Sequence, residues 1–556
     1  MLIEAGKKDM VRLVLNNASI EFASGAAINA QKVGRLILIA ADGSVNNITG
    51  GLASSDDELT TAASDADETD DTDKSYKAAV YSKNDLIVTG NGTINVTSDA
   101  RGMWAKDYLV ITGGVLNIKT STTGLRGSDG VAIKTVTATI NSGGDGVKST
   151  KEDDPTKGYI QLEDCTLTIN AGLDGIQAIS TLLVFSGIYN IKTGEGSAAV
   201  PLSANNMSGR GDVNRMFGIP TVATATISSD PSMKGMKSDV DIRLLGGEFI
   251  IDTQDDAIHS DGEITIYGGS YDISSGDDGI HAEKLLTVEG GVINITYGYE
   301  GLESAMMCIN GGDITITTSN DGLNVADGTA GQRGMGRSGG GATGSAMTLT
   351  INGGIIRVTG ADAVDADGNI IMNGGELYVS GPSMQQEGAI DVDGSFTVNG
   401  GSLITAGYVA GVSNASAQPV LHIQYSQSVD KDSLIELRDT KSGNTILSYV
   451  SNIACTVSGF SSPELKPGQN VSIYVNDAKR FDVAISESAA LTTAAEGGGA
   501  FAATGGHGGF GGFGGFGGFE GFSGFDEFGI ITTPPDPNQP YQRQGKPQRG
   551  IAPVQP

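Results

Sequence analysis

Residues 245–262 read LGGEFIIDTQDDAIHSDG, and the chain repeats this pattern three more times. The further copies read YGGSYDISSGDDGIHAEK at 267–284, EGGVINITYGYEGLESAM at 289–306 and NGGDITITTSNDGLNVAD at 310–327. Their period is 22, 22 and then 21 residues, and each copy has a Gly-Gly corner, a β-branched strand, an acidic corner and a second short strand. A unit this short cannot bury its own apolar face, so the copies must stack on one another. The repeat therefore predicts an all-β solenoid, a parallel β-helix with one coil per copy.

Weaker copies extend this pattern in both directions, with strands in which apolar and polar residues alternate. Asn precedes the glycine pair at 310, 352, 373 and 399, and we interpret these residues as a stacked structural ladder. A solenoid also needs its last edge covered. We expect a β-helix over 1–412 with insertions at 54–73, 195–239 and 327–346, a small β domain over 413–488 that caps the last coil, and a disordered Gly/Phe- and Pro/Gln-rich tail over 489–556.

Net charge and hydropathy indicate which classes of ligand the protein can bind and where it is located. The 556 residues carry a formal net charge of −30, which disfavours nucleic acid as a ligand and favours divalent cations. No apolar run approaches the ~20 residues of a transmembrane helix. The first ten residues are not a signal peptide, so we expect an export signal to be missing from this chain. The expected protein is an extracellular or cell-surface monomer.

One residue in each coil is predicted to face outward, because it follows an aliphatic residue that must point into the core. These successors are expected to form one exterior stripe, aromatic and then basic towards the N-terminus, and imidazole and then acidic towards the C-terminus. The stripe consists of Asn29, Tyr81, Trp104, Arg126, Lys148, Gln177, His259, His281, Glu303, Asn324, Asp365 and Asp391. As ligand-binding residues we predict Tyr81 and Trp104 stacking on sugar rings, Arg126 and Lys148 pairing with uronate carboxylates, and His259 and His281.

An acidic corner runs parallel to this stripe. Its carboxylates are Asp145, Asp174, Asp255, Asp256, Asp277, Asp278, Glu300 and Asp321, followed by Asp362 and Glu387. Like charges stacked ~5 Å apart repel unless a cation lies between them. Carboxylates of adjacent coils and corner carbonyls match the oxygen ligands of Ca²⁺. Two alternatives remain, solvated turn aspartates and zinc bound through His259 and His281.

Several motifs resemble a known family. AAVYSKNDLIVTG at 78–90, GGDGVKST at 143–150, SGDDGIHAEKLLTVEGGVINIT at 275–296 and SSPELKPGQ at 461–469 are similar to the bacterial carbohydrate-binding domain-containing β-helix family of clostridial surface proteins. The resemblance implies a right-handed parallel β-helix similar to pectate lyases, Ca²⁺ as cofactor, and cellulose or acidic polysaccharide such as polygalacturonate as ligand. By this resemblance, Asp277, Asp278, Glu300 and Glu303 correspond to the family's acidic motif, and Asp145 and Lys148 to its GDGVKS motif.

These observations predict calcium-dependent binding of an acidic polysaccharide without cleavage. A polysaccharide lyase is the main alternative, with Lys148 or Arg126 as base and calcium at Asp145 and Asp174. An unperturbed lysine has a pKa near 10.4, so that role requires a strongly lowered pKa. A third possibility is a structural adhesin.

Overall fold

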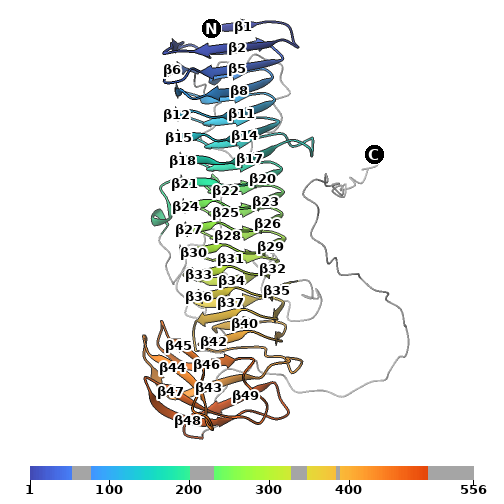
Figure 1. Ribbon diagram of the computed structural model, residues 1–556, viewed down its shortest axis with the longest axis vertical. Helices are drawn as coiled ribbons and strands as arrows, with labels where there is room; N and C mark the ends of the chain where they lie inside the picture. The colour runs from blue at the N-terminus through green and yellow to red at the C-terminus, as the bar shows by residue number, and fades with distance from the viewer. Residues whose placement is uncertain (53–76, 201–230, 327–346, 384–387, 499–556) are drawn as a thin grey trace, which may run out of the picture. The chain divides into compact units, whose positions relative to one another are not determined.

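The computed structural model describes residues 1–52, 77–200, 231–326, 347–383 and 388–498, all within one compact unit, Met1–Thr504. This part of the chain is all-β, with one short 3-10 element, η2 (Ser197–Ala199). The strands between residues 2 and 406 form parallel sheets in which each strand pairs with the third strand after it in the sequence (Figure 1). The predicted parallel β-helix is therefore confirmed. In the described ranges, no helix is long and apolar enough to cross a membrane.

Each coil contributes one strand to each of three sheets, which we call sheets A, B and C. Sheet A contains 14 short strands that carry the predicted exterior stripe. They are β1 (Leu2–Glu4), β4 (Ile28–Lys32), β7 (Ala78–Ser82), β10 (Arg101–Ala105), β13 (Leu125–Gly127), β16 (Val147–Ser149), β19 (Ile176–Ala178), β22 (Met236–Ser238), β25 (Ile258–Ser260), β28 (Ile280–Ala282), β31 (Leu302–Ser304), β34 (Asp321–Val325), β37 (Asp362–Ala366) and β40 (Ile390–Val392).

Sheet B follows sheet A in every coil. Its strands are β2 (Met10–Leu15), β5 (Arg35–Ala40), β8 (Asp85–Gly90), β11 (Tyr108–Thr112), β14 (Gly130–Lys134), β17 (Tyr159–Glu163), β20 (Thr181–Val184), β23 (Asp241–Leu244), β26 (Glu263–Ile266), β29 (Leu285–Val288), β32 (Met306–Ile309), β35 (Thr348–Ile351), β38 (Asn369–Met372) and β41 (Phe396–Val398).

Sheet C completes each coil. Its strands are β3 (Ser19–Glu21), β6 (Val45–Gly50), β9 (Thr93–Ser98), β12 (Val115–Thr120), β15 (Thr137–Ser142), β18 (Cys165–Ala171), β21 (Gly187–Thr193), β24 (Glu248–Asp252), β27 (Ser270–Ser274), β30 (Val292–Tyr297), β33 (Asp313–Thr317), β36 (Ile355–Thr359), β39 (Glu376–Ser380) and β42 (Ser402–Ala406).

The core lies between the three sheets, because alternate residues of every strand point inward. In sheet A, Ile258 pairs with Ile280, and Ile280 pairs with Leu302 in the next coil. In sheet C the rings of Tyr189, Phe249 and Tyr271 stack with centroids 4.8 and 4.7 Å apart. Each such side chain contributes about 1.5–3 kcal/mol by burial. Stacked identical positions therefore hold the coils in register.

The asparagines before the glycine pairs form the ladder expected from the sequence. The side-chain amide nitrogens of Asn352, Asn373 and Asn399 each donate to the Oδ1 of the preceding ladder residue, at 2.8, 2.9 and 2.9 Å. The turn through positive φ is made by the second glycine of the pair, as at Gly354 with φ +85°. The ladder is structural, as interpreted from the sequence.

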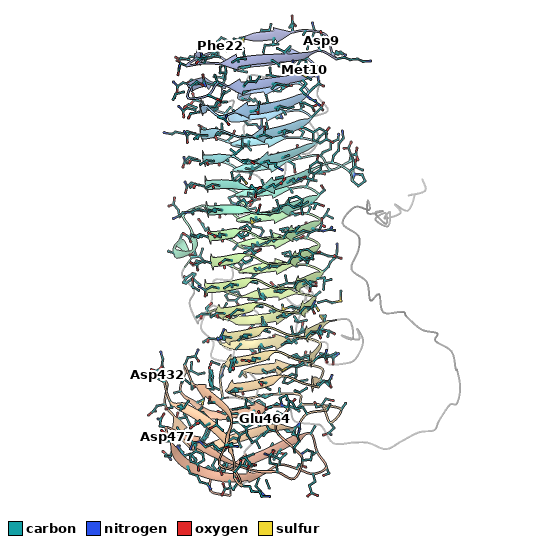
Figure 2. The ribbon with its side chains drawn as sticks, viewed as in Figure 1. Asp9, Met10, Phe22, Asp432, Glu464 and Asp477 are labelled. Atoms are coloured by element: carbon teal, nitrogen blue, oxygen red, sulfur yellow. The ribbon has the colours of Figure 1, made fainter. Side chains whose placement is uncertain are left out.

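The C-terminal strands cover the end of the β-helix. They are β43 (Val420–Val429), β44 (Leu434–Asp439), β45 (Thr445–Val450), β46 (Cys455–Ser461), β47 (Asn470–Val475), β48 (Ala478–Ala484) and β49 (Leu491–Ala495). Strand β46 pairs antiparallel with β42, the last strand of sheet C, and β44, β45, β47 and β48 form a separate sheet. Asp432 and Asp477 lie in turns of this region with positive φ (Figure 2).

Two predicted boundaries need correction. Strand β49 pairs with β43 and lies in the stretch that we assigned to the disordered tail. The predicted insertion at 195–239 contains β22, a full member of sheet A. The predicted insertions 54–73 and 327–346, and Glu387, lie outside the described residues.

The aromatic stack in sheet C gives a stability test. Phe249 is 2% exposed, whereas its neighbour Ile250 points outward and is 55% exposed. We expect Phe249→Ala to lower the free energy of unfolding by about 3–5 kcal/mol, because it leaves a cavity between two rings. Ile250→Ala should change it by less than about 0.5 kcal/mol. Chemical denaturation followed by circular dichroism measures both, and equal effects would contradict the stated inside–outside pattern.

Candidate functional site

The outer face of sheet A aligns the predicted stripe residue by residue. Direct pairs connect Tyr81 to Trp104, Trp104 to Arg126 and Arg126 to Lys148. The same register continues from His259 to His281 and then to Glu303. It also contains Lys237, between Gln177 and His259, which sequence reasoning missed. The available signal was the segment Gly-Met-Lys-Ser at 235–238, which matches Gly-Val-Lys-Ser at 146–149.

The corner residues form a second continuous column. The carbonyl of each corner residue accepts a hydrogen bond from the backbone N–H at the start of the preceding coil's sheet A strand. The acceptors are Asp145, Asp174, Lys234, Asp256, Asp278, Glu300 and Asp321, at 2.9–3.0 Å. Lys234 thus occupies a position that is acidic in the coils on either side. One lone pair of each corner carbonyl is thus engaged in the ladder.

The aromatic part of the stripe is not an open platform. Trp104 is 0% and Tyr81 4% exposed, and their rings meet edge to face at a centroid distance of 5.2 Å. The guanidinium carbons of Arg101 and Arg126 lie 4.8 and 5.3 Å from the Trp104 ring centroid. A ring without exposed surface cannot stack on a sugar. The predicted stacking role of Tyr81 and Trp104 therefore has no support in this conformation.

The basic part of the stripe is engaged with the acidic corner. Lys148 Nζ lies 2.9 Å from Asp145 Oδ2, and Lys237 Nζ lies 4.0 Å from Asp174 Oδ2. Burial and the neighbouring Asp145 raise the pKa of Asp174. Arg126 is buried beside Trp104. The predicted ligand-binding cations Arg126 and Lys148, and Lys237 with them, thus face an aromatic ring or carboxylates of the protein itself.

In the middle of the column the charges neutralise one another. Lys234 Nζ lies 2.9 Å from Asp255 Oδ1 and 2.5 Å from Asp256 Oδ2. Burial opposes the charged form of Lys234, but Asp256 and Asp255 outweigh it and raise its pKa. An ammonium therefore occupies the space between these carboxylates. Asp255 and Asp256 do not need the calcium ion that the sequence analysis placed there.

His259 belongs to the same neutralised group. Its Nδ1 lies 2.8 Å from Asp256 Oδ2, and its Nε2 lies 3.1 Å from Asp261 Oδ1. Burial lowers the pKa of His259, but the hydrogen bonds to Asp256 and Asp261 outweigh it and raise the pKa to about 9. Both ring nitrogens of His259 thus contact carboxylates, and zinc would have to displace a proton and one of these contacts to bind there.

The next two coils lack such compensation. Asp278, His281 and Glu303 bring possible ligand atoms within 4.8 Å of one another. Asn324 Nδ2 donates to Glu300 Oε2 at 2.6 Å and to Glu303 Oε1 at 3.5 Å, which places Glu300 beside this group. In the described part of the chain, no lysine or arginine forms an ion pair with Asp278, Glu300 or Glu303. Burial lowers the pKa of His281, which favours the neutral ring. We call Asp278, Glu300 and Glu303 the acidic cluster. Asp277 is exposed and its carboxylate lies with those of Asp255 and Asp256, and Asp321 is the buried corner residue of the following coil.

The pKa values of all three carboxyl groups in the acidic cluster are raised, so these groups stay protonated to a higher pH than usual. Burial and the carboxylate of Asp256 raise the pKa of Asp278 to about 7. Burial and Asp278 raise the pKa of Glu300 to about 8, although Asn324 Nδ2 donates to Glu300 Oε2 at 2.6 Å. Burial and Asp278 also raise the pKa of Glu303 well above its usual range. A divalent cation would relieve this repulsion, and hard carboxylate oxygens are the ligands that Ca²⁺ prefers. The residues present therefore fit the cation.

Comparison with known proteins gives two findings. The family described as carbohydrate-binding domain-containing protein matches residues 1–279, which is half of the 556-residue chain and includes strands β1–β27. Among solved structures, the chain is similar to the polysaccharide lyase-like protein from C. thermocellum, solved as a gadolinium derivative. The two are 26% identical, with 35% of this chain and 73% of that chain covered and a TM-score of 0.30. No curated protein matches the chain.

The raised pKa values give a pH test. Without divalent cations, the free energy of unfolding should fall as pH rises from about 4 to about 8. In the unfolded chain Asp278 and Glu300 ionise near 3.8 and 4.5, but in the folded protein they hold protons to about 7 and 8. Unfolding therefore releases protons in this window, so stability falls as pH rises. Thermal unfolding in chelator measures the slope, which Asp278→Asn should flatten; an unchanged slope in this variant would contradict the assignment.

Proposed function

The chain belongs to the carbohydrate-binding domain-containing family, and we propose that it binds an acidic polysaccharide such as polygalacturonate through calcium on the outer face of sheet A. The observation that carries the proposal is the acidic cluster: three carboxylates from adjacent coils, with no lysine or arginine paired to them among the described residues. One bridging ion would account both for carbohydrate binding, which the family's name indicates, and for the three carboxylates of the acidic cluster.

Calcium would be held by Asp278, Glu300 and Glu303. Ca²⁺ takes six to eight oxygens. The three carboxylates fill only part of this coordination shell and leave ligand positions for water or an incoming carboxylate. A uronate carboxylate is a hard oxygen ligand of the required charge. The acidic cluster, with calcium bound, therefore favours an acidic glycan over a neutral one.

A lyase is less well supported than a binding protein. β-Elimination requires an unprotonated base, but Lys148, the base considered above, lies 2.9 Å from the carboxylate of Asp145, and a neighbouring carboxylate favours the charged ammonium. Arg126 is buried against the Trp104 ring. Both side chains are thus engaged within the protein and are not placed to remove a proton next to a uronate carboxylate.

A pull-down with polygalacturonate tests the proposed function. The wild-type protein should be retained with calcium and released by a chelator. Asp278→Asn combined with Glu303→Gln should weaken retention about tenfold or more, because both changes remove negative ligands of the ion. Asp272→Asn is the matched control, since Asp272 lies exposed on sheet C of the same coil. Retention that is indifferent to chelator and to the double variant would contradict the proposal.

The same incubation also decides between binding and cleavage. Ultraviolet absorbance of the unsaturated product should stay flat while the polysaccharide is retained. A rise in absorbance that Lys148→Ala abolishes would contradict the hypothesis of binding without cleavage and would establish a lyase.

A further inference from the structure

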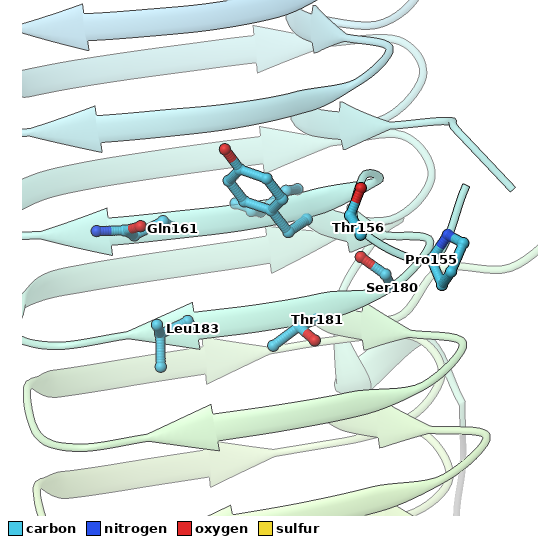
Figure 3. A pocket seen from close by; sticks show the side chains of 8 residues that line it. Pro155, Thr156, Gln161, Ser180, Thr181 and Leu183 are labelled. Atoms are coloured by element: carbon cyan, nitrogen blue, oxygen red, sulfur yellow. The ribbon is translucent and has the colours of Figure 1, made fainter. Parts of the chain in front are cut away.

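A hollow of about 250 Å³ lies on the outer face of sheet B, a different sheet from the one that carries the acidic cluster. Gln161 on β17 and Thr181 and Leu183 on β20 line it from the sheet, and Pro155 and Thr156 line it from the preceding loop (Figure 3). Tyr159, the first residue of β17, completes its aromatic side. Drug-sized ligand pockets span about 300–1,000 Å³, so this space suits a single small ring.

Gly130 allows the rings of Tyr108 and Tyr159 to approach each other beside the hollow. Gly130 pairs with Tyr108 on one side and with Tyr159 on the other, so the two tyrosines are two strands apart. Their ring centroids nevertheless lie only 6.0 Å apart, at an interplanar angle of 38°. A Cβ at position 130 would lie 3.3 Å from an atom of each ring. Gly130 thus permits a joined aromatic surface that any side chain there would disturb.

The loop that walls the hollow is fixed by several contacts. The step from Gly130 to Tyr159 is 29 residues, whereas the step from Tyr108 to Gly130 is 22, so this coil contains an extra segment. Lys157 Nζ bonds to Asp129 Oδ2 at 2.6 Å, and Ser180 Oγ donates to the Lys157 carbonyl at 2.6 Å. The wall is therefore positioned before any ligand arrives, which reduces the ordering cost of binding.

The chemistry of the lining indicates the ligand. None of the described residues that line the hollow is charged, although the whole chain carries a net charge of −30. Within the described part of the chain, no protein group hydrogen-bonds to the Gln161 amide or to the Tyr159 hydroxyl. Thr181 donates to Asp241, and Asp154 and Asp129 lie close to the wall, so an anionic sugar would meet carboxylates. An aromatic face with a free amide suits the apolar face and hydroxyl rim of a neutral sugar ring.

We propose that this hollow binds one neutral hexopyranose unit of a polysaccharide, with the ring stacked on Tyr159 and its hydroxyls bonded to Gln161. The site is separate from the calcium-dependent site on sheet A and needs no metal ion. The protein thereby holds two faces for carbohydrate, one for a neutral sugar and one for an acidic sugar.

The test is a titration of the full chain with cellohexaose at millimolar concentrations in the presence of chelator, followed by calorimetry. Binding should occur without calcium. Tyr159→Ala should weaken it about tenfold, because it removes the aromatic platform. Gly130→Val should also weaken it, since a β-branched residue suits a strand but pushes the two rings apart. Tyr267→Ala is the matched control, since Tyr267 is 51% exposed elsewhere on the coil stack, and it should bind like the wild type.

Two outcomes would overturn the proposal: no binding of cellohexaose by the wild type, or equal loss of binding in Tyr159→Ala and Tyr267→Ala. Circular dichroism of each variant checks that the β-helix is intact. Failure here is distinguishable from failure of the sheet A proposal, because retention on polygalacturonate with calcium is measured separately and should be unchanged in Tyr159→Ala.

Discussion

In-register stacking is the constraint on which the rest of this structure depends. Equivalent residues of successive coils lie about 4.8 Å apart, so an aliphatic residue at one position extends the core and a carboxylate there extends a line of negative charge. The core benefits at every coil, as along Ile258, Ile280 and Leu302. The acidic corner incurs repulsion at every coil, and each coil has to resolve it locally.

The corner resolves that repulsion in different ways along the chain. Asp145 and Asp174 face Lys148 and Lys237 on the neighbouring stripe, and Asp255 and Asp256 hold Lys234 within the corner itself. Asp278, Glu300 and Glu303 have no such cation among the described residues and retain their protons instead. The carboxylates without a lysine partner are the ones to which we assign a bound divalent cation. We therefore assign ligand binding to the coils in which lysine or arginine does not balance the charge of the described carboxylates.

The period and alternation of the sequence predicted the coil, the register of the stripe and the position of the acidic corner, because these follow from a repeat of about 22 residues. Alternation gives the direction in which a side chain leaves the core, but not what covers it outside, so the burial of Trp104 was not foreseen. Lys234 and Lys237 were missed because their coil follows a long insertion. The hollow beside Tyr159 depends on Gly130 and a seven-residue lengthening of one coil, which carry no periodic signal.

We place a divalent cation at the acidic cluster and not at the neutralised carboxylates one coil earlier. A crystal structure grown with calcium, with anomalous differences measured at long wavelength, locates the ion directly. We expect an anomalous peak bounded by Asp278, Glu300 and Glu303, with Lys234 still paired to Asp255 and Asp256. A peak between Asp255 and Asp256 with Lys234 displaced, or no peak along the column, would contradict it.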